Sequence, residues 1–474
     1  MSGNDEKTDR EKYEGSNDMM QHQRKAGLIQ EKTFYRNFFG LTAAIAFQNL
    51  LTYSVGLADN LMLGAYSETA LSGAALCNQI QFLLQMLVVG TSDGVIVIGS
   101  QYWGKNQKEP IVHIIGVALR FSIGIAAVIF AAVLFFPSGV LSLLTNEPHV
   151  IAEGTRYLQT VCFSYIIFAV TNVLSASLRS VGIVKIGYLI SGSTLCLNIC
   201  LNYCLIYGNF GFPELGIRGA ATATLFSRCV EFLILVLYLK FKDTGIPLSL
   251  KSLIHVDKSY YADYKKVSLP VLVNQFQWGI AQMVQTGVLG HLGSAAIAAN
   301  SIAVIVFQIL SVVVYGSAGA AGIVVGKTIG EGKEDRLQSL VKTLEAIFIV
   351  VGIISSALIF AVRGPVLMLY HISPDASALA RQFMAVLALT TLGTAYQMSC
   401  DSGIIKGGGD TSFSAKMNFI SMWGIVVPFS CIAAFILHWP PVAVFFLLKW
   451  DQLYKCIPVI LRLRSFQWVK RVTR

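Results

Sequence analysis

Acidic residues inside long apolar stretches are the first candidates for chemistry in this sequence. An ionisable group placed in hydrocarbon costs about 3 kcal/mol or more and is therefore a functional candidate by default. Asp59 lies in such a stretch and shares a helix face with Gln48 and Thr52, so a polar stripe would face the protein interior. A partly buried carboxylate there could take up and release a proton or hold Na⁺. The alternative is a structural Asp that caps a loop.

Amides and a hydroxyl in the same half could surround this carboxylate. Asn198 and Asn202 lie four residues apart, on one face of an expected helix, and their carbonyl oxygens suit hydrogen bonding to a carboxylate or ligation of Na⁺. Packing between membrane helices through polar side chains is the other reading of this pair. Thr224 is expected at a depth compatible with Asp59 and Asn202.

Other acidic residues in apolar segments have weaker claims. Asp93 occurs in the glycine-broken stretch Gly90-Thr-Ser-Asp-Gly94, and irregular backbone at membrane depth is tolerated where it lines protein or a wet cavity. A pore-lining role and a structural role are equally open for it. Asp401, near the inner end of its segment, is a secondary candidate. Glu231 follows Arg228 by three residues, which favours a structural ion pair.

A second polar face lies in the other half of the chain. Gln275, Trp278, Gln282 and Gln285 follow one another at helical spacing and form one continuous face. Amides and aromatic rings suit large, weakly hydrated organic cations, through stacking and cation–π attraction. We therefore expect a substrate cavity between the halves, although helix packing through glutamines would give the same pattern. Its expected lining is Gln48, Asn49, Tyr53, Gln275, Trp278, Gln282 and Gln285.

The elements that must position these residues are membrane helices. The 474-residue chain is 54% hydrophobic and 13% charged, and apolar runs near the roughly 20 residues that span a bilayer recur along it. We expect an all-α polytopic membrane protein with twelve transmembrane helices. Their expected centres are Leu50, Leu87, Ile125, Ile167, Leu197, Phe232, Ala281, Val312, Val350, Ala388, Gly424 and Phe446.

Charge sets the expected orientation of these helices. Most of the 36 Lys and Arg residues fall in the tails and in the loops on one side, which predicts cytoplasmic termini in a multi-pass protein of the cell membrane. The net charge of +10 therefore does not indicate nucleic-acid binding, since no soluble module is left for it. No signal peptide is recognisable at the N-terminus. The nine cysteines have no metal-ligand spacing, so we expect no cofactor.

The chain repeats itself at an offset of 226 residues. Gly90 then falls on Gly316, and Gly104 falls on Gly330. Because an even number of spans separates equivalent points, the two halves are parallel repeats, an architecture of transporters that handle substrate between the halves. The expected parts are a disordered tail (1–33), an N-lobe of six helices (34–240), a cytoplasmic linker (241–266), a C-lobe of six helices (267–464) and a basic cytoplasmic tail (465–474).

Catalytic motifs are missing from the sequence. It contains no GxxxxGK[ST] phosphate loop, so the chain is not expected to hydrolyse ATP. No nucleophile–base constellation or pair of carboxylates in loops indicates an enzyme. An ion gradient is the remaining source of energy for transport.

Short motifs in a fixed order carry a family resemblance over roughly residues 38–474. They are Val55-Gly-Leu-Ala-Asp59-Asn-Leu-Met-Leu-Gly64, Gln101-Tyr-Trp-Gly104, Leu178-Arg-Ser-Val-Gly182, Asn198-Ile-Cys-Leu-Asn202-Tyr-Cys-Leu-Ile206-Tyr-Gly208, Gly211-Phe-Pro-Glu-Leu-Gly216, Gly219-Ala-Ala-Thr-Ala-Thr224, Leu269-Pro270 and Gly403-Ile-Ile-Lys-Gly-Gly-Gly-Asp410. In this order the chain resembles the multidrug and toxic compound extrusion (MATE) family, in the manner of bacterial, Firmicute-type members.

The resemblance implies a V-shaped, MATE/MOP-like pair of lobes around a central cavity. It implies a secondary antiporter, a monomer in the bilayer, that exports cationic or lipophilic drugs and other small organic compounds in exchange for H⁺ or Na⁺. Asp59 matches the acidic residue of the family's first helix, Asn198 matches an Asn of its fifth, and Asn172 with Thr224 would complete the polar cluster.

Departures from the family pattern place the expected ion coupling in the N-lobe. Asn202 stands where some members have an acidic residue, and Trp278 stands where others have a glutamate. Asp401 is not at the position of the acidic residue found in the tenth helix of some members. A flippase for a lipid-linked glycan precursor is the alternative function, but it would need a more cationic cavity than Arg120 and Arg228 alone could supply.

Overall fold

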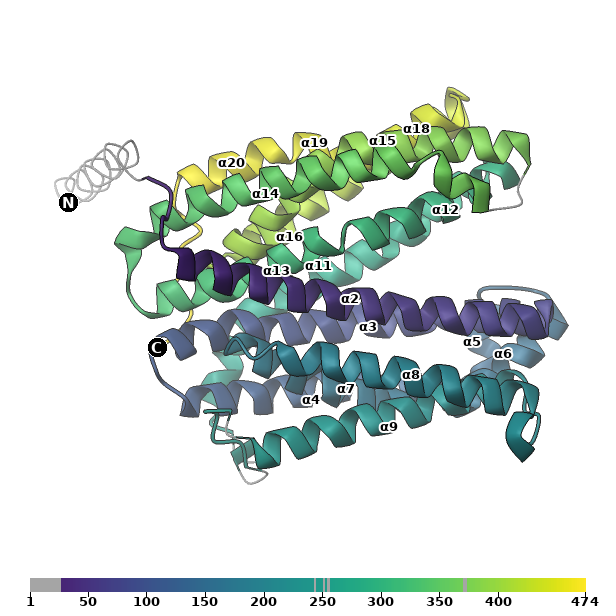
Figure 1. The fold of residues 1–474 in the computed structure, drawn as a ribbon, viewed down its shortest axis with the longest axis horizontal. Helices are drawn as coiled ribbons and strands as arrows, with labels where there is room; N and C mark the ends of the chain where they lie inside the picture. The colour runs from purple at the N-terminus through teal and green to yellow at the C-terminus, as the bar shows by residue number, and fades with distance from the viewer. Residues whose placement is uncertain (1–26, 243, 250–251, 254–255, 370–372) are drawn as a thin grey trace, which may run out of the picture.

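The computed structural model describes residues 27–242, 244–249, 252–253, 256–369 and 373–474. They form two bundles of long helices that lie side by side, one from each half of the chain (Figure 1). The described residues contain no β-strand, only an isolated bridge between Gly409 and Val469. The predicted all-α, two-lobed fold is therefore confirmed.

The helices of the N-lobe are α2 (Lys32–Tyr66), α3 (Glu68–Gly104), α4 (Glu109–Phe135), α5 (Pro137–Ser142), α6 (Pro148–Val161), α7 (Ser164–Ser180), α8 (Lys185–Tyr207), η1 (Asn209–Gly211) and α9 (Ile217–Phe241). Those of the C-lobe are α11 (Ser259–Gly290), α12 (Ser294–Leu310), α13 (Val312–Gly330), α14 (Glu334–Val362), η2 (Pro365–Leu369), α15 (Pro374–Met398), η3 (Ser399–Ile405), α16 (Thr411–Phe419), η4 (Ile420–Val426), α17 (Val427–Cys431), η5 (Ile432–Ile436), α18 (Pro441–Lys449), α19 (Asp451–Tyr454) and α20 (Cys456–Arg464).

The number of apolar spans differs from the predicted twelve. Each predicted centre lies in a helix, but within the described part of the chain nine helices are long and apolar enough to cross a membrane, or ten if α6 and α7, bent by 52°, form one span. The predicted spans outside this set are α11, which glutamines make polar, and the broken series α18–α20. Lys449, Asp451 and Lys455 interrupt that series, so its apolar runs are short.

The glycines of the sequence repeat bring the lobes together. α2 packs on α13, and α3 packs on both α11 and α13. A Cβ atom on Gly90 of α3 would lie 2.7 Å from Cα of Leu272, and one on Gly316 of α13 would lie 3.0 Å from the backbone nitrogen of Ala46. Leu272 follows Ala46 by the same 226 residues that separate the two glycines, so the repeat exchanges the two contacts. Only glycine permits such close approach of two backbones.

A second pair of repeated glycines closes one end of the molecule. A Cβ atom on Gly104 would lie 2.2 Å from the carbonyl oxygen of Lys327, and one on Gly330 would lie 2.1 Å from that of Gln101. These contacts lie at the ends of α3 and α13. We call this the closed end; the C-terminus lies there too, on the left in Figure 1.

The C-terminal segment, residues 465–474, extends from the C-lobe to the N-lobe across the closed end. The backbone nitrogen of Lys470 donates to the carbonyl oxygen of Gly408 in the C-lobe (2.8 Å), and Gln101 Nε2 of the N-lobe donates to the Lys470 carbonyl oxygen (3.0 Å). The backbone nitrogen of Val472 donates to Gln101 Oε1 (3.0 Å). The segment that the sequence marks as a basic tail is thus bound to both lobes.

The predicted boundaries differ from the helix bounds in two places. Most of the predicted tail, residues 1–26, lies outside the described residues, and α2 begins at Lys32. The helix α11 begins at Ser259, inside the predicted linker 241–266. The two lobes are therefore joined by a connection shorter than the sequence suggests.

Candidate functional site

Asp59 is part of a hydrogen-bonded cluster inside the N-lobe. Asn202 Nδ2, from α8, donates to Asp59 Oδ1 at 2.5 Å and also lies 3.2 Å from Asn198 Oδ1. Both asparagines are almost fully buried, at 1% exposure for Asn198 and 0% for Asn202. The one-turn spacing of the two amides on α8 places them in line toward α2. The structure thus brings together three of the predicted coupling residues.

The cluster keeps polar atoms that none of the described residues satisfies. Asn202 Oδ1 and Asn198 Nδ2 are buried without a hydrogen-bond partner. Buried polar atoms without partners are uncommon and call for a water, a proton or an ion. Oxygen atoms of Asp59 and Asn202 are the ligand type that Na⁺ takes, whereas protonation of Asp59 would need the carboxylate alone. Groups of three or more His, Cys, Asp or Glu that could hold a metal do not occur among the described residues.

The other predicted N-lobe residues lie at different distances from this cluster. Thr224 of α9 is buried beside Tyr157 of α6, which also senses the charge of Asp59. Gln48 lies against α8, since a Cβ atom on Gly187 would lie 2.5 Å from Gln48 Oε1. Asn172 is half-buried on α7, and no hydrogen bond joins it to the cluster within the described residues.

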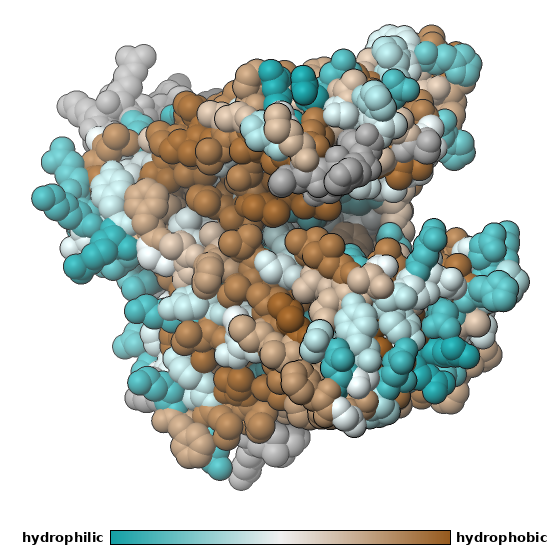
Figure 2. Space-filling view, turned by 45° about the vertical axis from the view of Figure 1, so that its right-hand side comes forward, coloured by the Kyte–Doolittle hydropathy of each residue, from teal (hydrophilic) through white to brown (hydrophobic). Residues whose placement is uncertain are grey.

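The lobes separate toward the end opposite to the closed end. Figure 2 shows a cleft between them there, and apolar side chains cover the middle of the same face. Where α3 meets α11, the rings of Phe82 and Trp278 lie 6.1 Å apart, and beyond this contact the cleft opens. Tyr53 of α2 is 36% exposed and near Tyr315 of the opposite lobe. Tyr53 and Trp278 are therefore placed as the predicted cavity requires.

The polar face of α11 is divided between the cleft side and the lobe interior. Gln275 and Gln282 are half-buried, whereas Gln285 is buried at 5% exposure. Gln285 Oε1 accepts a hydrogen bond from Lys449 Nζ at 2.9 Å, and its Nε2 lies 3.5 Å from Met422 Sδ. Asn49, at the repeat-equivalent position of Gln275, is half-buried on α2.

Asp59 and Gln285 occupy equivalent places in the two lobes. Asp59 lies 13 residues beyond Ala46 on α2, and Gln285 lies 13 residues beyond Leu272 on α11. Ala46 and Leu272 make the exchanged glycine contacts, so both polar residues lie about 20 Å farther along their helices, at the rise of 1.5 Å per residue. Each turns into its own lobe.

Asp93 forms an ion pair between the lobes. Lys406 Nζ, which follows η3, lies 2.7 Å from Asp93 Oδ2 on α3, and both side chains are 18% exposed. The buried Arg179 lies close enough to interact with the same carboxylate. The predicted alternatives for Asp93 were a pore-lining and a structural role, and this contact is a link that holds the lobes together.

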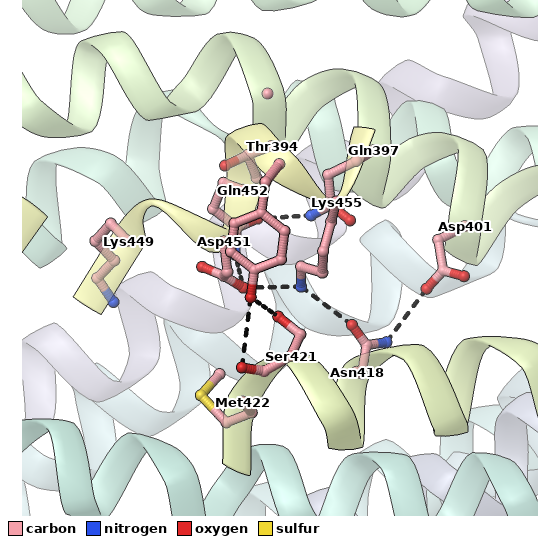
Figure 3. A network of polar contacts seen from close by, with 12 residues as sticks. Thr394, Gln397, Asp401, Asn418, Ser421, Met422, Lys449, Asp451, Gln452 and Lys455 are labelled. Atoms are coloured by element: carbon pink, nitrogen blue, oxygen red, sulfur yellow. Dashed lines mark hydrogen bonds and ion pairs between the residues drawn. The ribbon is translucent and has the colours of Figure 1, made fainter. Parts of the chain in front are cut away.

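Asp401 belongs to a polar network inside the C-lobe that the sequence analysis did not anticipate. Figure 3 shows it between α15, α16 and α19. Asp401 accepts hydrogen bonds from Ser414 Oγ (2.6 Å) and Asn418 Nδ2 (3.3 Å). Asn418 Oδ1 accepts from Lys455 Nζ, which also pairs with Asp451 at 2.8 Å. The spacing of Asp451 and Lys455, one helical turn, was the available signal.

The expectation that only Arg120 and Arg228 place positive charge within the spans is wrong. Lys449 and Lys455 lie in the last helical series, inside the C-lobe. They escaped notice because they follow the apolar run of α18 and resemble the end of a span. Arg228 itself pairs with Glu231 at 2.6 Å, as predicted.

Comparisons with known proteins agree with this architecture. The family model described as MatE matches residues 44–204 and 270–432, once in each lobe and with starts 226 residues apart. An uncharacterized transporter of Bacillus subtilis, YisQ, is 26% identical over 445 residues, 93% of this chain and 96% of that protein. A probable multidrug resistance protein NorM of Thermotoga maritima is 25% identical over 382 residues, 80% of this chain and 82% of that one.

A solved structure shares the fold. A MOP superfamily transporter from Pyrococcus furiosus superposes with a TM-score of 0.83 at 20% identity, covering 92% of this chain and 96% of that one. Two lobes of membrane helices around a cleft define the transporter class. The chain belongs to the MatE family, and it is thus an efflux transporter and not an enzyme. The resemblance seen in the sequence is confirmed, and the relatives do not favour the flippase alternative.

Proposed function

We propose that this transporter is a secondary antiporter that exports small organic compounds, cationic or lipophilic, in exchange for H⁺ or Na⁺. The observation that carries the proposal is the Asp59 cluster: a carboxylate inside the membrane region, bonded to Asn202, beside buried amide atoms that lack partners. An ionisable group in that position is expensive unless it has a use.

The proposed cycle uses the two ends of the molecule. With the termini in the cytoplasm, as the distribution of Lys and Arg favours, the closed end faces inward and the cleft faces outward. A cation that binds at Asp59 from the outside replaces the hydrogen bond of Asn202 and changes the packing of α2 against α8. Substrate then leaves the cleft, and the ion is released after the lobes open inward.

The cleft supplies the proposed binding surface for substrate. Tyr53 and Trp278 offer aromatic rings, and the half-buried Gln275, Gln282 and Asn49 offer amides. Rings attract organic cations through their π-faces, and amides add few fixed hydrogen bonds, which permits varied substrates. We propose that the monomer carries out the whole cycle in the cell membrane.

The test is ethidium efflux from proteoliposomes under separately imposed proton and sodium gradients. We expect one of the gradients to drive efflux by the wild type and Asp59→Asn to abolish that dependence. Asp375→Asn is the matched control, because Asp375 is exposed at the start of α15. Full ion-driven efflux by Asp59→Asn at equal reconstitution would refute the proposed role of Asp59.

A further inference from the structure

The two lobes carry opposite polarity at equivalent places. In the N-lobe, Asp59 faces the neutral amides of Asn202 and Asn198. In the C-lobe, the repeat-equivalent residue is the neutral Gln285, and it faces the ammonium of Lys449 at 2.9 Å. The first helix of one lobe therefore presents an anion to amides, and that of the other presents an amide to a cation.

The charge of Lys449 lacks an anionic partner within ion-pair distance among the described residues. Asp451, two residues farther on, pairs with Lys455 at 2.8 Å and accepts from Gln452 at 2.9 Å. In Figure 3 Lys449 lies to one side of this network, with its amine directed away from it. An ammonium carries three N–H groups, and the contact with Gln285 uses one. A buried charge without a counter-ion is unfavourable.

Further donors near Lys449 are poorly satisfied. Gln285 Nε2 has only the thioether of Met422 as acceptor, at 3.5 Å, and a thioether sulfur is a weak acceptor. The indole N–H of Trp450, the next residue after Lys449, is buried without a partner among the described residues. The region thus has an excess of donors, which an anion with several acceptor oxygens would satisfy.

Apolar side chains surround these donors. Met422, Leu448 and Val288 are buried members of one apolar cluster, and Trp450 packs against it. Lys449 itself keeps part of its surface exposed. The site therefore combines one accessible cation with an apolar wall, which suits a carboxylate attached to an apolar body.

We infer that Lys449 and Gln285 form a carboxylate-binding site in the C-lobe, for a substrate that carries a carboxylate on an apolar body. The inference rests on the proposed export function and narrows its substrate class, from organic cations in general to amphiphilic compounds with a carboxylate, zwitterions included. In a zwitterion, the cationic group would remain available to the aromatic rings of the cleft.

The test compares two probes of the same shape. ε-Dansyl-lysine is a zwitterion with a free carboxylate, and its methyl ester has the same body without that charge. Binding of each to the purified full-length transporter is measured by dansyl fluorescence, without an ion gradient. We expect the carboxylate probe to bind about tenfold tighter than the ester, as for one charge-assisted hydrogen bond. Equal binding of acid and ester by the wild type overturns the inference without any variant.

Variants of Lys449 assign the effect to this side chain. Lys449→Gln should make the two probes bind equally, whereas Lys449→Arg should keep most of the preference for the carboxylate. Lys333→Gln, which removes an exposed lysine at the closed end, should keep the full preference. A preference that persists in Lys449→Gln, or that Lys333→Gln abolishes as well, places the carboxylate elsewhere and overturns the inference.

The proposed antiport and the carboxylate site can fail separately. Ion-driven ethidium efflux by the wild type tests the antiport, and equilibrium binding of the two dansyl probes tests the site. A wild type that distinguishes acid from ester but moves ethidium under neither gradient refutes the antiport and retains the site. The converse result retains the antiport and refutes the site.

Discussion

The carboxylate of Asp93 and the ammonium of Lys406 lie 2.7 Å apart and join the two lobes through an ion pair. The partners are 313 residues apart in the chain and belong to α3 and to the turn after η3. An inward opening at the closed end must separate these helices, so the pair must break in each proposed transport cycle. The pair therefore stabilises the conformation with the cleft open.

Removing either partner should loosen the closed end, and the two removals should differ. Asp93→Asn leaves Lys406 and the buried Arg179 without their shared carboxylate, whereas Lys406→Met leaves Asp93 beside Arg179. We expect Asp93→Asn to lower stability by about 1.5–3 kcal/mol and Lys406→Met to lower it less. Thermal unfolding in detergent measures the order, and hydrogen exchange of α3 near Gly104 measures the loosening.

The exchanged pair Asp93→Lys with Lys406→Asp is not a suitable control, because it would place a second cation beside Arg179. The suitable control is Lys327→Met, which removes a half-exposed lysine of the same end, paired only with Glu331 at 3.8 Å. It should leave hydrogen exchange unchanged. Equal effects of Lys327→Met and Asp93→Asn would contradict a specific role for the pair.

The contact between Asp59 and Asn202 should appear as non-additivity. Asp59→Asn and Asn202→Ala each remove one partner of the 2.5 Å hydrogen bond, so the double variant should lose less stability than the two single losses together. We expect an interaction free energy of about 0.5–3 kcal/mol. Thermal unfolding of the four proteins closes the cycle. Thr52→Val is the matched control, because its hydroxyl bonds to the carbonyl oxygen of Gln48 in its own helix.

The repeated glycines give the sharpest prediction about stability. A methyl group on Gly330 would lie 2.1 Å from the Gln101 carbonyl oxygen, so Gly330→Ala must push the lobes apart. We expect a loss of about 1–3 kcal/mol. Gly124→Ala on α4 meets nothing within 4 Å and should stabilise the protein by up to about 1 kcal/mol, because alanine favours a helix. Thermal unfolding of both variants measures the contrast, and a neutral Gly330→Ala would show that the closed end yields easily.

The sequence predicted what periodicity and local spacing can carry. The 226-residue offset marked the glycines of the lobe interface, and the spacing of Asn198 and Asn202 marked the face toward Asp59. The pair of Asp93 and Lys406 was beyond reach, because its partners are not repeat-equivalent. Lys449 was missed because a charge after an apolar run resembles the end of a helix, and only tertiary packing shows that α18–α20 keeps it inside.

The C-terminal segment should hold the closed end through its backbone. The backbone groups of Lys470 and Val472 make the bonds to Gly408 and Gln101, and Arg474 adds an ion pair with Asp263 at 2.7 Å. Deleting residues 469–474 should therefore lower the melting temperature and speed hydrogen exchange around Gln101. Exposed ion pairs contribute little, so the loss of Arg474 alone should have a small effect.

Two variants separate backbone from side-chain contributions in this segment. Val472→Ala keeps the backbone bond to Gln101 and should behave as the wild type, whereas Gln101→Leu removes the acceptor and the donor together and should reproduce most of the deletion. Exchange rates that are the same in the deletion and the wild type would mean that the segment rests on the lobes without holding them. In that case the glycine contacts and the pair of Asp93 with Lys406 alone would set the stability of the closed end.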